Sequence, residues 1–319
     1  MYRHFLQSPA WETFIKSEGK STFRLKDKDF EAFCFIESTS LGNYLYCPYG
    51  PVLSDKNPAS ALAHALKKLT ELAKAQHCFF IRIEPTHPFT KKSLTPLGLK
   101  KSHDLNPAHT WVLDLSPDVP TLLSGFSQGT RTRHNQFPKK GLSVTVSTNP
   151  SDISHLTRLQ HKLASEKGIN TFSNSYLKNE LSQPFASLFL VHYHDLNTKN
   201  AADHIISASL FFDDKENSTR YYMQSATDSE YKKLPATVGL LTSAIFDAKA
   251  KGLKNFDFWG IAPDDAKPSH PWAGFTAFKK SFGGSARTYS GTYDLPLSPI
   301  KYQFYRLLRA LNRLRRRLF

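Results

Sequence analysis

The chain has 319 residues, 40% of them hydrophobic and 13% aromatic, which suits about two folded domains and excludes an intrinsically disordered chain. Its 42 Lys and Arg residues outnumber its 27 Asp and Glu residues. The resulting formal net charge of +15 favours a polyanionic partner such as nucleic acid, nucleotide phosphates or an anionic membrane surface. The cysteines Cys34, Cys47 and Cys78 form no C-x-x-C pair, which argues against a disulfide framework or a zinc site and fits a reducing compartment.

The localisation follows from two further absences in the sequence. The first residues contain no apolar segment typical of a secretory signal, and no apolar run approaches the roughly 18 residues of a membrane span. We therefore expect a cytoplasmic protein, with attachment to the inner face of the membrane left open.

The first third of the chain predicts an α/β unit. Two aromatic-rich segments, 30–38 and 43–53, have the character of strands. They lead to a helix over 57–76, where Asn57 is suited to cap the first turn. The leucines of this helix recur at the spacing of one helical face: Leu62, Leu66, Leu69 and Leu72. An apolar strand over 78–85 follows.

The same order of elements occurs again later in the chain. Strands are predicted over 185–195, 204–214 and 219–226, then a helix over 235–252 and a strand over 254–261. This repetition predicts an internal duplication of one α/β unit. A basic segment, a short strand over 142–146 and a helix over 151–168 separate the copies, which places the domain boundary near Gly141.

The last 20 residues predict an amphipathic basic helix. Its apolar stripe is Phe304, Leu307, Leu311, Leu314 and Leu318, and its arginines are Arg306, Arg309, Arg313, Arg315, Arg316 and Arg317. The helix either packs on a domain with a solvated basic side, or contacts tRNA phosphates or anionic lipid headgroups.

Two motifs suggest chemistry only weakly. Residues 125–129, GFSQG, match the G-x-S-x-G of a nucleophile elbow, but no strand precedes Ser127 and no partner His is evident. His192 and His194 share one strand face and adjoin Asp195, yet no further ligand stands at a diagnostic spacing. We expect neither a serine nucleophile nor a bound metal, and no cofactor.

Charged residues elsewhere in the chain are better candidates for substrate binding and catalysis. Arg131, Arg133, Lys139 and Lys140 surround Phe137 between the presumed domains and suit phosphate contact, or form a solvated charged surface. Glu84 ends the apolar strand FIRIEP, where its carboxylate either accepts a proton from an attacking amine or pairs with Arg82 or a neighbouring cation.

Residues 270–284, HPWAGFTAFKKSFGG, combine aromatic residues, adjacent lysines and flexible glycines. A cation beside a ring, near a flexible backbone, suits negative charge on a phosphate or on the oxyanion of acyl transfer. The alternative is that Lys279 and Lys280 simply extend over Phe278 into solvent.

Several segments, taken in order, resemble the FemABX family of peptidyltransferases, which build the interpeptide bridges of peptidoglycan. They are FLQSPAWETFIKSEG, NYLYCPYGPVL, FIRIEP, RTRHNQFPKKGLSVTV, YYMQSATD and FDFWGI with HPWAGFTAFKKSFGGSARTYSGTYDLPL. The resemblance implies two tandem GNAT-like domains of the α/β (α+β) class, with mixed sheets flanked by helices. We expect domain 1 over 1–140 and 286–319 and domain 2 over 141–285.

The resemblance also implies the reaction. An aminoacyl-tRNA gives its amino acid to the stem-peptide amine of a UDP-MurNAc-pentapeptide or a lipid-linked precursor, and both substrates are polyanionic. The chain is similar to the compact type that lacks a coiled-coil insertion.

Site residues follow from the resemblance by position. Phe278 and Lys279 fall on the family's late Phe-Lys motif, Glu84 on its carboxylate after the third strand, and Lys16 near an early phosphate-binding lysine. Tyr176 and Tyr222 fall on precursor-contacting tyrosines, with Gln224 as the alternative to Tyr222. Phe172 stands where some members have a phosphate-binding arginine, a role that Arg131 or Arg133 would take over.

Two other functions remain open at this stage. One is a non-catalytic protein of the same fold that binds RNA or membrane through its basic surfaces. The other is an acyl-CoA-dependent N-acyltransferase, which is disfavoured because no R/Q-x-x-G-x-G/A pyrophosphate loop precedes a helix.

Overall fold

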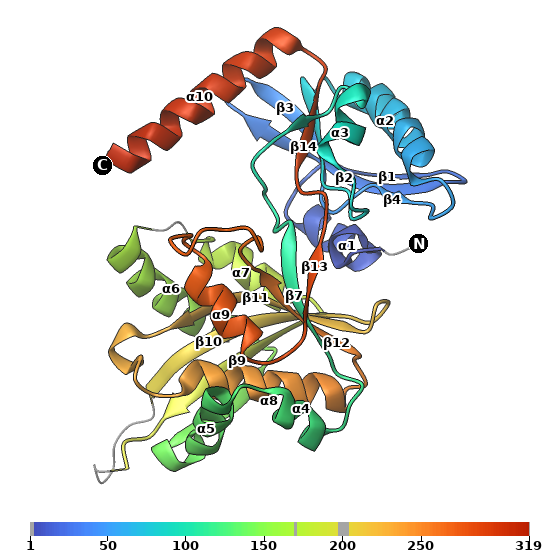
Figure 1. Ribbon diagram of the computed structural model, residues 1–319. Helices are drawn as coiled ribbons and strands as arrows, with labels where there is room; N and C mark the ends of the chain where they lie inside the picture. The colour runs from blue at the N-terminus through green and yellow to red at the C-terminus, as the bar shows by residue number, and fades with distance from the viewer. Residues whose placement is uncertain (1–2, 169–170, 197–203, 319) are drawn as a thin grey trace. The chain divides into compact units, whose positions relative to one another are not determined.

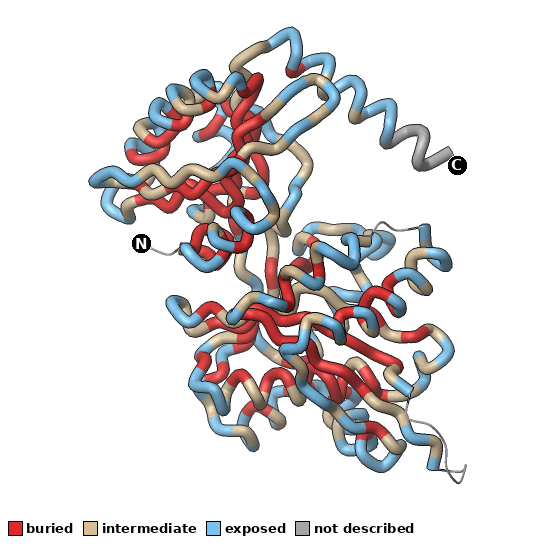
Figure 2. Tube along the Cα trace, turned by 180° about the vertical axis from the view of Figure 1, so that it is seen from behind, coloured by how far each residue is buried: buried red, intermediate tan, exposed pale blue. Residues whose placement is uncertain are grey.

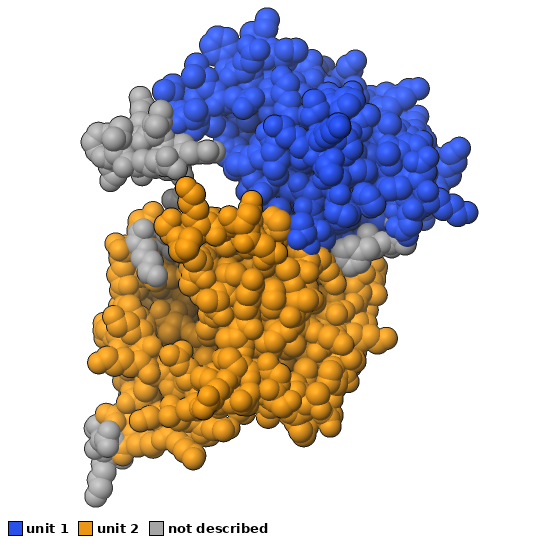
Figure 3. All heavy atoms as spheres, viewed as in Figure 1, with its two compact units in different colours: residues 1–108, 288–319 blue, residues 109–287 orange. Residues whose placement is uncertain are grey.

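The computed structural model describes residues 3–168, 171–196 and 204–318, apart from the side chains of residues 167 and 313–318 (Figure 1). The side chains expected at Arg313, Leu314, Leu318 and residues 315–317 therefore lie outside the described residues. The chain divides into two compact units, residues 1–108 with 288–319 and residues 109–287 (Figure 3).

The first unit is built from an N-terminal and a C-terminal part of the chain. Its helices are η1 (Phe5–Gln7), α1 (Pro9–Ser17), α2 (Pro58–Ala75), α3 (Lys91–Leu94), η2 (Thr95–Leu97) and α10 (Pro299–Leu318). Its strands are β1 (Thr22–Lys26), β2 (Phe30–Thr39), β3 (Gly42–Cys47), β4 (Val52–Leu53), β5 (Phe80–Ile83), β6 (Lys100–Lys101) and β14 (Tyr293–Pro296).

The sheet of this unit has the order β1-β2-β3-β5-β14-β6, with β4 beside β2. Helix α2 begins as the sequence predicts, because the side chain of Asn57 accepts a hydrogen bond from the Ser60 N–H and Pro58 needs no partner for its nitrogen. Its buried face packs Leu62, Leu66 and Leu69 against the sheet and forms the core of the unit.

The second unit contains the remaining elements. Its helices are α4 (Val119–Gly125), α5 (Gln128–Gln136), η3 (Pro138–Lys140), η4 (Pro150–Asp152), α6 (Ile153–Lys167), α7 (Asn174–Leu181), η5 (Ser229–Tyr231), α8 (Ala236–Ala250) and α9 (Ala273–Lys280). Its strands are β7 (His109–Asp114), β8 (Leu142–Ser147), β9 (Ala186–Tyr193), β10 (His204–Asp214), β11 (Thr219–Thr227), β12 (Asn255–Gly260) and β13 (Ser285–Thr288).

The sheet of this unit has the strand order β13-β7-β12-β11-β10-β9-β8. Helix α8 covers one face of the sheet, and α6 and α9 cover the other (Figure 1). Helix α8 is apolar on nearly every side because it contacts both the sheet and α5. The buried residues, red in Figure 2, concentrate in the strands and in the helix faces that cover them.

The predicted duplication is visible in the strand pairing. In the first unit β1, β2 and β3 pair antiparallel, α2 crosses over, and β5 pairs parallel to β3 and antiparallel to β14. In the second unit β9, β10 and β11 pair antiparallel, α8 crosses over, and β12 pairs parallel to β11 and antiparallel to β7. The α/β class with two mixed sheets flanked by helices is therefore confirmed.

The division of the chain differs from the expected boundary near Gly141. Residues 109–140 belong to the second unit because β7 pairs with β12, and because Leu122, Phe126 and Phe137 of the following segment enter the core of that unit. The C-terminal part returns to the first unit from residue 288, where β14 pairs with β5.

Candidate functional site

Two neighbouring parallel strands of the second unit separate part of the way along their length. Strands β11 and β12 pair only from Thr219↔Asn255 to Tyr221↔Asp257. Beyond that point β11 continues beside β10, while β12 follows β7 through an irregularity between Asp257 and Gly260. Beyond Asp257 the two strands are therefore not paired with each other.

A cavity of about 650 Å³ lies in this region of the second unit. Strand β11 and the start of α8 supply apolar and hydroxyl groups to its walls, and α9 supplies aromatic side chains. Its described lining residues include three cations, Arg133, Lys232 and Lys279, and no carboxylate. Such a lining suits a ligand that combines apolar parts with negative charge.

Lys279 is the most confined of these cations. Its ammonium group donates a hydrogen bond of 2.5 Å to the carbonyl oxygen of Gly260, at the end of β12. Burial lowers the pKa of Lys279 to about 8, and the nearby negative charge of Asp257 opposes this shift in part. The group is therefore largely protonated at neutral pH but only weakly solvated.

Asp257 supports the turn that carries the Gly260 carbonyl. One carboxylate oxygen accepts a hydrogen bond from the Trp259 N–H at 2.7 Å, and the other accepts one from the Thr110 hydroxyl at 3.1 Å. Trp259 adopts a left-handed backbone with φ 66°. This conformation is unfavourable for a bulky residue, and such residues cluster at functional sites. Burial raises the pKa of Asp257 to about 6.

The sequence reasoning missed Asp257 as a site residue. The available signal was a charged residue inside the apolar run FDFWG. A buried carboxylate is unfavourable unless hydrogen bonds or a charge partner stabilise it. Asp257 accepts a hydrogen bond from the Trp259 N–H, which holds the turn that presents the Gly260 carbonyl to Lys279.

The adjacent lysines of residues 270–284, Lys279 and Lys280, have different surroundings. The motif forms a short helix, α9, which the sequence reasoning did not predict. Lys279 lines the cavity, whereas Lys280 lies exposed over the ring of Trp111, 5.2 Å from its centroid. Phe278 lines the cavity and contacts Phe282, which is fully buried.

The glycines after α9 are required by close packing. Gly284 has φ 96°, and a Cβ atom there would lie 2.4 Å from the carbonyl oxygen of Val112 on β7. The preceding Gly283 carbonyl accepts a hydrogen bond from the Trp111 indole. These contacts fix the end of α9, and with it Lys279, against the sheet.

Tyr222 also lines the cavity, from strand β11. Its ring stacks on Phe211, its hydroxyl interacts with Ser225 and Ser209, and burial raises the pKa of the phenol. The alternative residue, Gln224, accepts a hydrogen bond from Gln160 and is not among the lining residues.

The two candidate phosphate-binding arginines separate in the structure. Arg133 of α5 lines the cavity. Arg131 instead donates hydrogen bonds to the carbonyl oxygens of Ser124, at 3.0 Å, and Phe126, and so caps the end of α4. Arg131 is thus engaged by the backbone, and Arg133 is the better candidate.

Two other predicted positions are not among the described residues that line this cavity. Lys16 belongs to the first unit, where it is exposed and pairs with Glu12 at 2.8 Å. Tyr176 lies at the start of α7, and its ring stacks on the exposed Phe172 with 5.1 Å between centroids. Neither Lys16 nor Tyr176 is among the described residues that line the cavity.

Glu84 of the first unit is a buried carboxylate. Only 2% of the residue is exposed. It accepts hydrogen bonds from the hydroxyls of Tyr46 and Thr292, from the backbone and side-chain N–H groups of Asn106, and from the Tyr49 N–H. A carboxylate that accepts hydrogen bonds from several buried donors is a poor proton acceptor for a substrate. These contacts disfavour the catalytic role expected for Glu84, which stays a prediction.

The alternative pairing of Glu84 with Arg82 is also absent. Arg82 is 1% exposed and forms a bidentate pair with Asp294 of β14, at 2.7 and 2.8 Å. This pair ties the returning C-terminal strand to β5.

The serine and histidine motifs have structural roles. The hydroxyl of Ser127 accepts a hydrogen bond from the Thr130 N–H and caps α5, and a helix rather than a strand precedes it. His192 bonds to the Thr145 hydroxyl at 2.8 Å, and the His194 N–H donates to the Gly141 carbonyl. Both motifs therefore have hydrogen-bond partners within the second unit.

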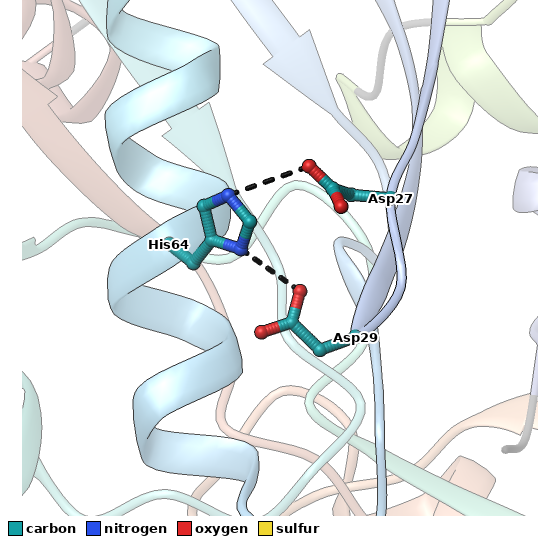
Figure 4. Close-up of side chains that lie close together, drawn as sticks. All are labelled: Asp27, Asp29 and His64. Carbon is teal, nitrogen blue, oxygen red and sulfur yellow. Dashed lines mark hydrogen bonds and ion pairs between the residues drawn. The ribbon is translucent and has the colours of Figure 1, made fainter.

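One cluster in the described chain has the residue types of a metal site: Asp27, Asp29 and His64. Figure 4 shows the His64 ring between the two carboxylates, with Nδ1 2.9 Å from Asp29 and Nε2 3.4 Å from Asp27. Because each ring nitrogen faces a different carboxylate on an accessible surface, the contacts are explained by hydrogen bonding between α2 and the β1–β2 turn.

Comparison with solved structures supports the fold. The chain is similar to the crystal structure of FemX, at 19% identity and a TM-score of 0.78 over 94% of each chain. It is also similar to the C-terminal domain of a putative lysylphosphatidylglycerol synthetase from Agrobacterium fabrum, at 11% identity and a TM-score of 0.60 over 93% of this chain and 92% of that chain. A tandem GNAT protein from the clavulanic acid biosynthesis pathway matches at 12% identity and a TM-score of 0.52, over 85% of this chain and 80% of that chain.

No curated protein sequence matches the chain. Within its described part, no helix has both the length and the apolar character that crossing a membrane requires. The sequence profile of the FemAB family matches residues 1–104 and 190–310, which is more than half of the chain. The chain therefore belongs to the FemAB family, whose members are aminoacyltransferases of peptidoglycan interpeptide-bridge synthesis.

Proposed function

We propose that this enzyme transfers an amino acid from aminoacyl-tRNA to the stem-peptide amine of a UDP-linked or lipid-linked MurNAc-pentapeptide, in the cytoplasm. The observation that carries the proposal is a weakly solvated lysine, Lys279, inside a cation-lined cavity of a FemAB-family chain. The net charge of +15 suits two polyanionic substrates.

The chemistry needs no covalent enzyme intermediate, because the donor is already an activated ester. The neutral amine of the precursor attacks the ester carbonyl, and an N–C bond forms as the bond to the tRNA ribose oxygen breaks. The ribose oxygen takes up the proton that the attacking amine loses. Orientation of the two substrates alone lowers such barriers by roughly 7–11 kcal/mol.

Lys279 is placed to stabilise the negative charge that grows on the carbonyl oxygen. Its ammonium group has three N–H donors, and one of them bonds to the Gly260 carbonyl. A donor directed at the oxyanion contributes about 3–4 kcal/mol in a site shielded from water. We propose that Phe278, which lines the same cavity, shields this group.

The other cations of the cavity suit phosphate. Arg133 offers bidentate geometry and Lys232 a compact charge, and both line the same cavity as Lys279. We propose that they contact the phosphates of one substrate, and that Tyr222 borders the same ligand. Arg131, Lys16 and Tyr176 have no part in this proposal, because their contacts lie elsewhere.

An acyl-CoA-dependent reaction is disfavoured. In that reaction a glycine-rich loop before a helix binds the pyrophosphate through backbone N–H groups. The segment before α8, DSEYKKLP at residues 228–235, has no glycine, and Pro235 at the helix start has no N–H to donate. A purely RNA- or membrane-binding protein would not require a lysine with a lowered pKa inside a cavity.

The proposal is tested by transfer itself. The purified chain is incubated with a mixture of charged tRNAs and either precursor, and the products are weighed by mass spectrometry. A mass increase of one or more aminoacyl residues on the precursor is the expected result. Absence of transfer with every charged tRNA and both precursors, while acyl-CoA produces a modified amine, would overturn it.

Binding measurements separate the three functions independently of turnover. Thermal stabilisation by UDP-MurNAc-pentapeptide is expected for the transferase. Stabilisation by RNA alone would favour the non-catalytic alternative, and stabilisation by CoA would favour the acyl-CoA enzyme.

A further inference from the structure

Helix α10 is attached to the first unit by one side only. Tyr302 is 1% exposed, and its hydroxyl donates to the Asp294 carboxylate at 2.8 Å. Tyr305 packs beside Phe80 with 5.1 Å between ring centroids, and its hydroxyl accepts a hydrogen bond from Arg309. The side of α10 that faces the unit is therefore aromatic and polar.

The other side of α10 carries large apolar residues that are exposed. Within the described residues the exposed fractions are 72% for Ile300, 59% for Phe304, 55% for Leu307, 40% for Leu308 and 46% for Leu311. These five are almost half of the eleven large hydrophobic residues found exposed in the described chain, so the exposure is concentrated on one helix. Figure 2 shows the described part of α10 as mostly exposed.

The helical geometry separates these two sides. Successive residues turn by about 100° around a helix axis, so Phe304, Leu307 and Leu311 share one side and Tyr302 and Arg309 lie opposite. A helix that packs through a core-facing apolar stripe would have the reverse arrangement. The apolar row is thus left for a partner outside the unit.

Positive charge borders the row on both sides. Lys301 and Arg306 are exposed, and each lies between the apolar row and the attached side. Arg306 and Arg309 also line a polar cavity of about 380 Å³ with His103. The sequence of α10 contains no Asp or Glu over its 20 residues.

This combination selects one partner chemistry. A protein groove would meet the apolar row but gains little from cations on both borders, and RNA would meet the cations but leave the row in water. An apolar row bordered by Lys and Arg along one side of a helix matches the boundary between headgroups and acyl chains of an anionic bilayer, when the helix lies in the plane of that bilayer.

We propose that α10 binds the surface of anionic phospholipid bilayers, with Ile300, Phe304, Leu307 and Leu311 inserted among the acyl chains and Lys301, Arg306 and Arg309 on the phosphates. No residue of this surface is among the described residues that line the cavity with Lys279. The proposal does not depend on the transfer reaction.

The test is flotation of the full chain with vesicles of phosphatidylcholine, alone or mixed with phosphatidylglycerol. Binding to the mixed vesicles, weakened by high salt, is the expected result. The triple variant Phe304→Ser, Leu307→Ser, Leu311→Ser is expected to lose roughly tenfold or more of this binding. The control Val146→Ser, which removes an apolar residue of 48% exposure from β8, should bind as the parent does.

Other outcomes overturn the proposal. They are equal binding to both kinds of vesicle, no binding to either, and vesicle binding that the triple variant retains. Self-association or RNA binding that the triple variant abolishes, without vesicle binding by the parent, would assign the surface to another partner. In the triple variant, circular dichroism and transfer to the soluble precursor are both expected to be unchanged. These two measurements distinguish loss of vesicle binding from misfolding and from failure of the proposed transfer reaction.

Discussion

The ammonium group of Lys279 donates to the carbonyl oxygen of Gly260 at 2.5 Å, which joins helix α9 to the end of strand β12. The contact holds a cation in a cavity where burial has already lowered its pKa. Asp257 supports the turn at the end of β12, because its carboxylate accepts a hydrogen bond from the Trp259 N–H. Charge and backbone conformation at this site are therefore coupled.

Replacing Lys279 by Met is expected to lower kcat by about 100- to 1,000-fold, because one donor to the developing oxyanion is lost. The KM for either substrate should change much less, since the donor acts mainly in the transition state. Steady-state transfer kinetics measure both constants. The matched control is Lys280→Met, whose side chain lies over Trp111, and it should keep near-normal kcat. Normal kcat in Lys279→Met would refute the charge-stabilising role.

The same variant makes a prediction about stability. The usual lysine pKa of 10.5 falls to about 8 in the folded chain, so the charged form is destabilised by folding. Below pH 8 both states are protonated and the full cost applies, about 3 kcal/mol. Between about pH 8 and 10.5 the unfolded chain binds more protons, so stability rises with pH.

Urea unfolding at pH 7 and at pH 10 checks this sign. Lys279→Met should be more stable than the parent at pH 7, and the difference should shrink at pH 10. An equal difference at both pH values would mean that Lys279 titrates normally.

Asp257→Asn should shift the alkaline limb of the pH–rate profile to lower pH. The carboxylate favours the charged form of Lys279, so its removal lowers the lysine pKa further. The Asn side chain can still accept the Trp259 N–H bond, which keeps the turn. The pH dependence of kcat for parent and variant is the measurement, and an unchanged alkaline limb would contradict the coupling.

Glu84→Gln should affect stability rather than catalysis. The charged acceptor is buried among five donor groups, so its neutralisation is expected to destabilise the first unit by about 1–3 kcal/mol. Thermal unfolding and kcat below the unfolding transition should be measured together. A large loss of kcat at unchanged Tm would instead restore Glu84 as a catalytic base.

Gly239→Ala is expected to destabilise the second unit by about 1–3 kcal/mol through overpacking. A Cβ atom at Gly239 on α8 would lie 1.9 Å from the Phe137 ring at the end of α5, the helix that carries Arg133. Gly129 on α5 is the control, because a Cβ atom there meets nothing within 4 Å. Gly129→Ala should be neutral or gain up to about 1 kcal/mol in chemical unfolding. Equal effects of the two variants would contradict the packing of α8 on Phe137.

The local elements of this protein were predictable because their signals lie within a few residues. Asn57 and the leucine spacing were sufficient for α2, and the repeated order of strands and helix was sufficient for two α/β units. The motif containing Phe278 and Lys279 was also visible, and both residues line one cavity together with Tyr222 and Arg133.

Only the tertiary structure decided which polar side chains are available to a ligand. Arg82 pairs with Asp294 rather than with Glu84, across 212 positions of sequence, and Arg131 caps α4 while Arg133, two residues later, reaches the cavity. Likewise, Asp257 gains its role from an irregularity between β12 and β7. Side-chain chemistry and helical periodicity are local properties, whereas burial and hydrogen-bond partners depend on distant strand pairing, which short sequence patterns do not encode.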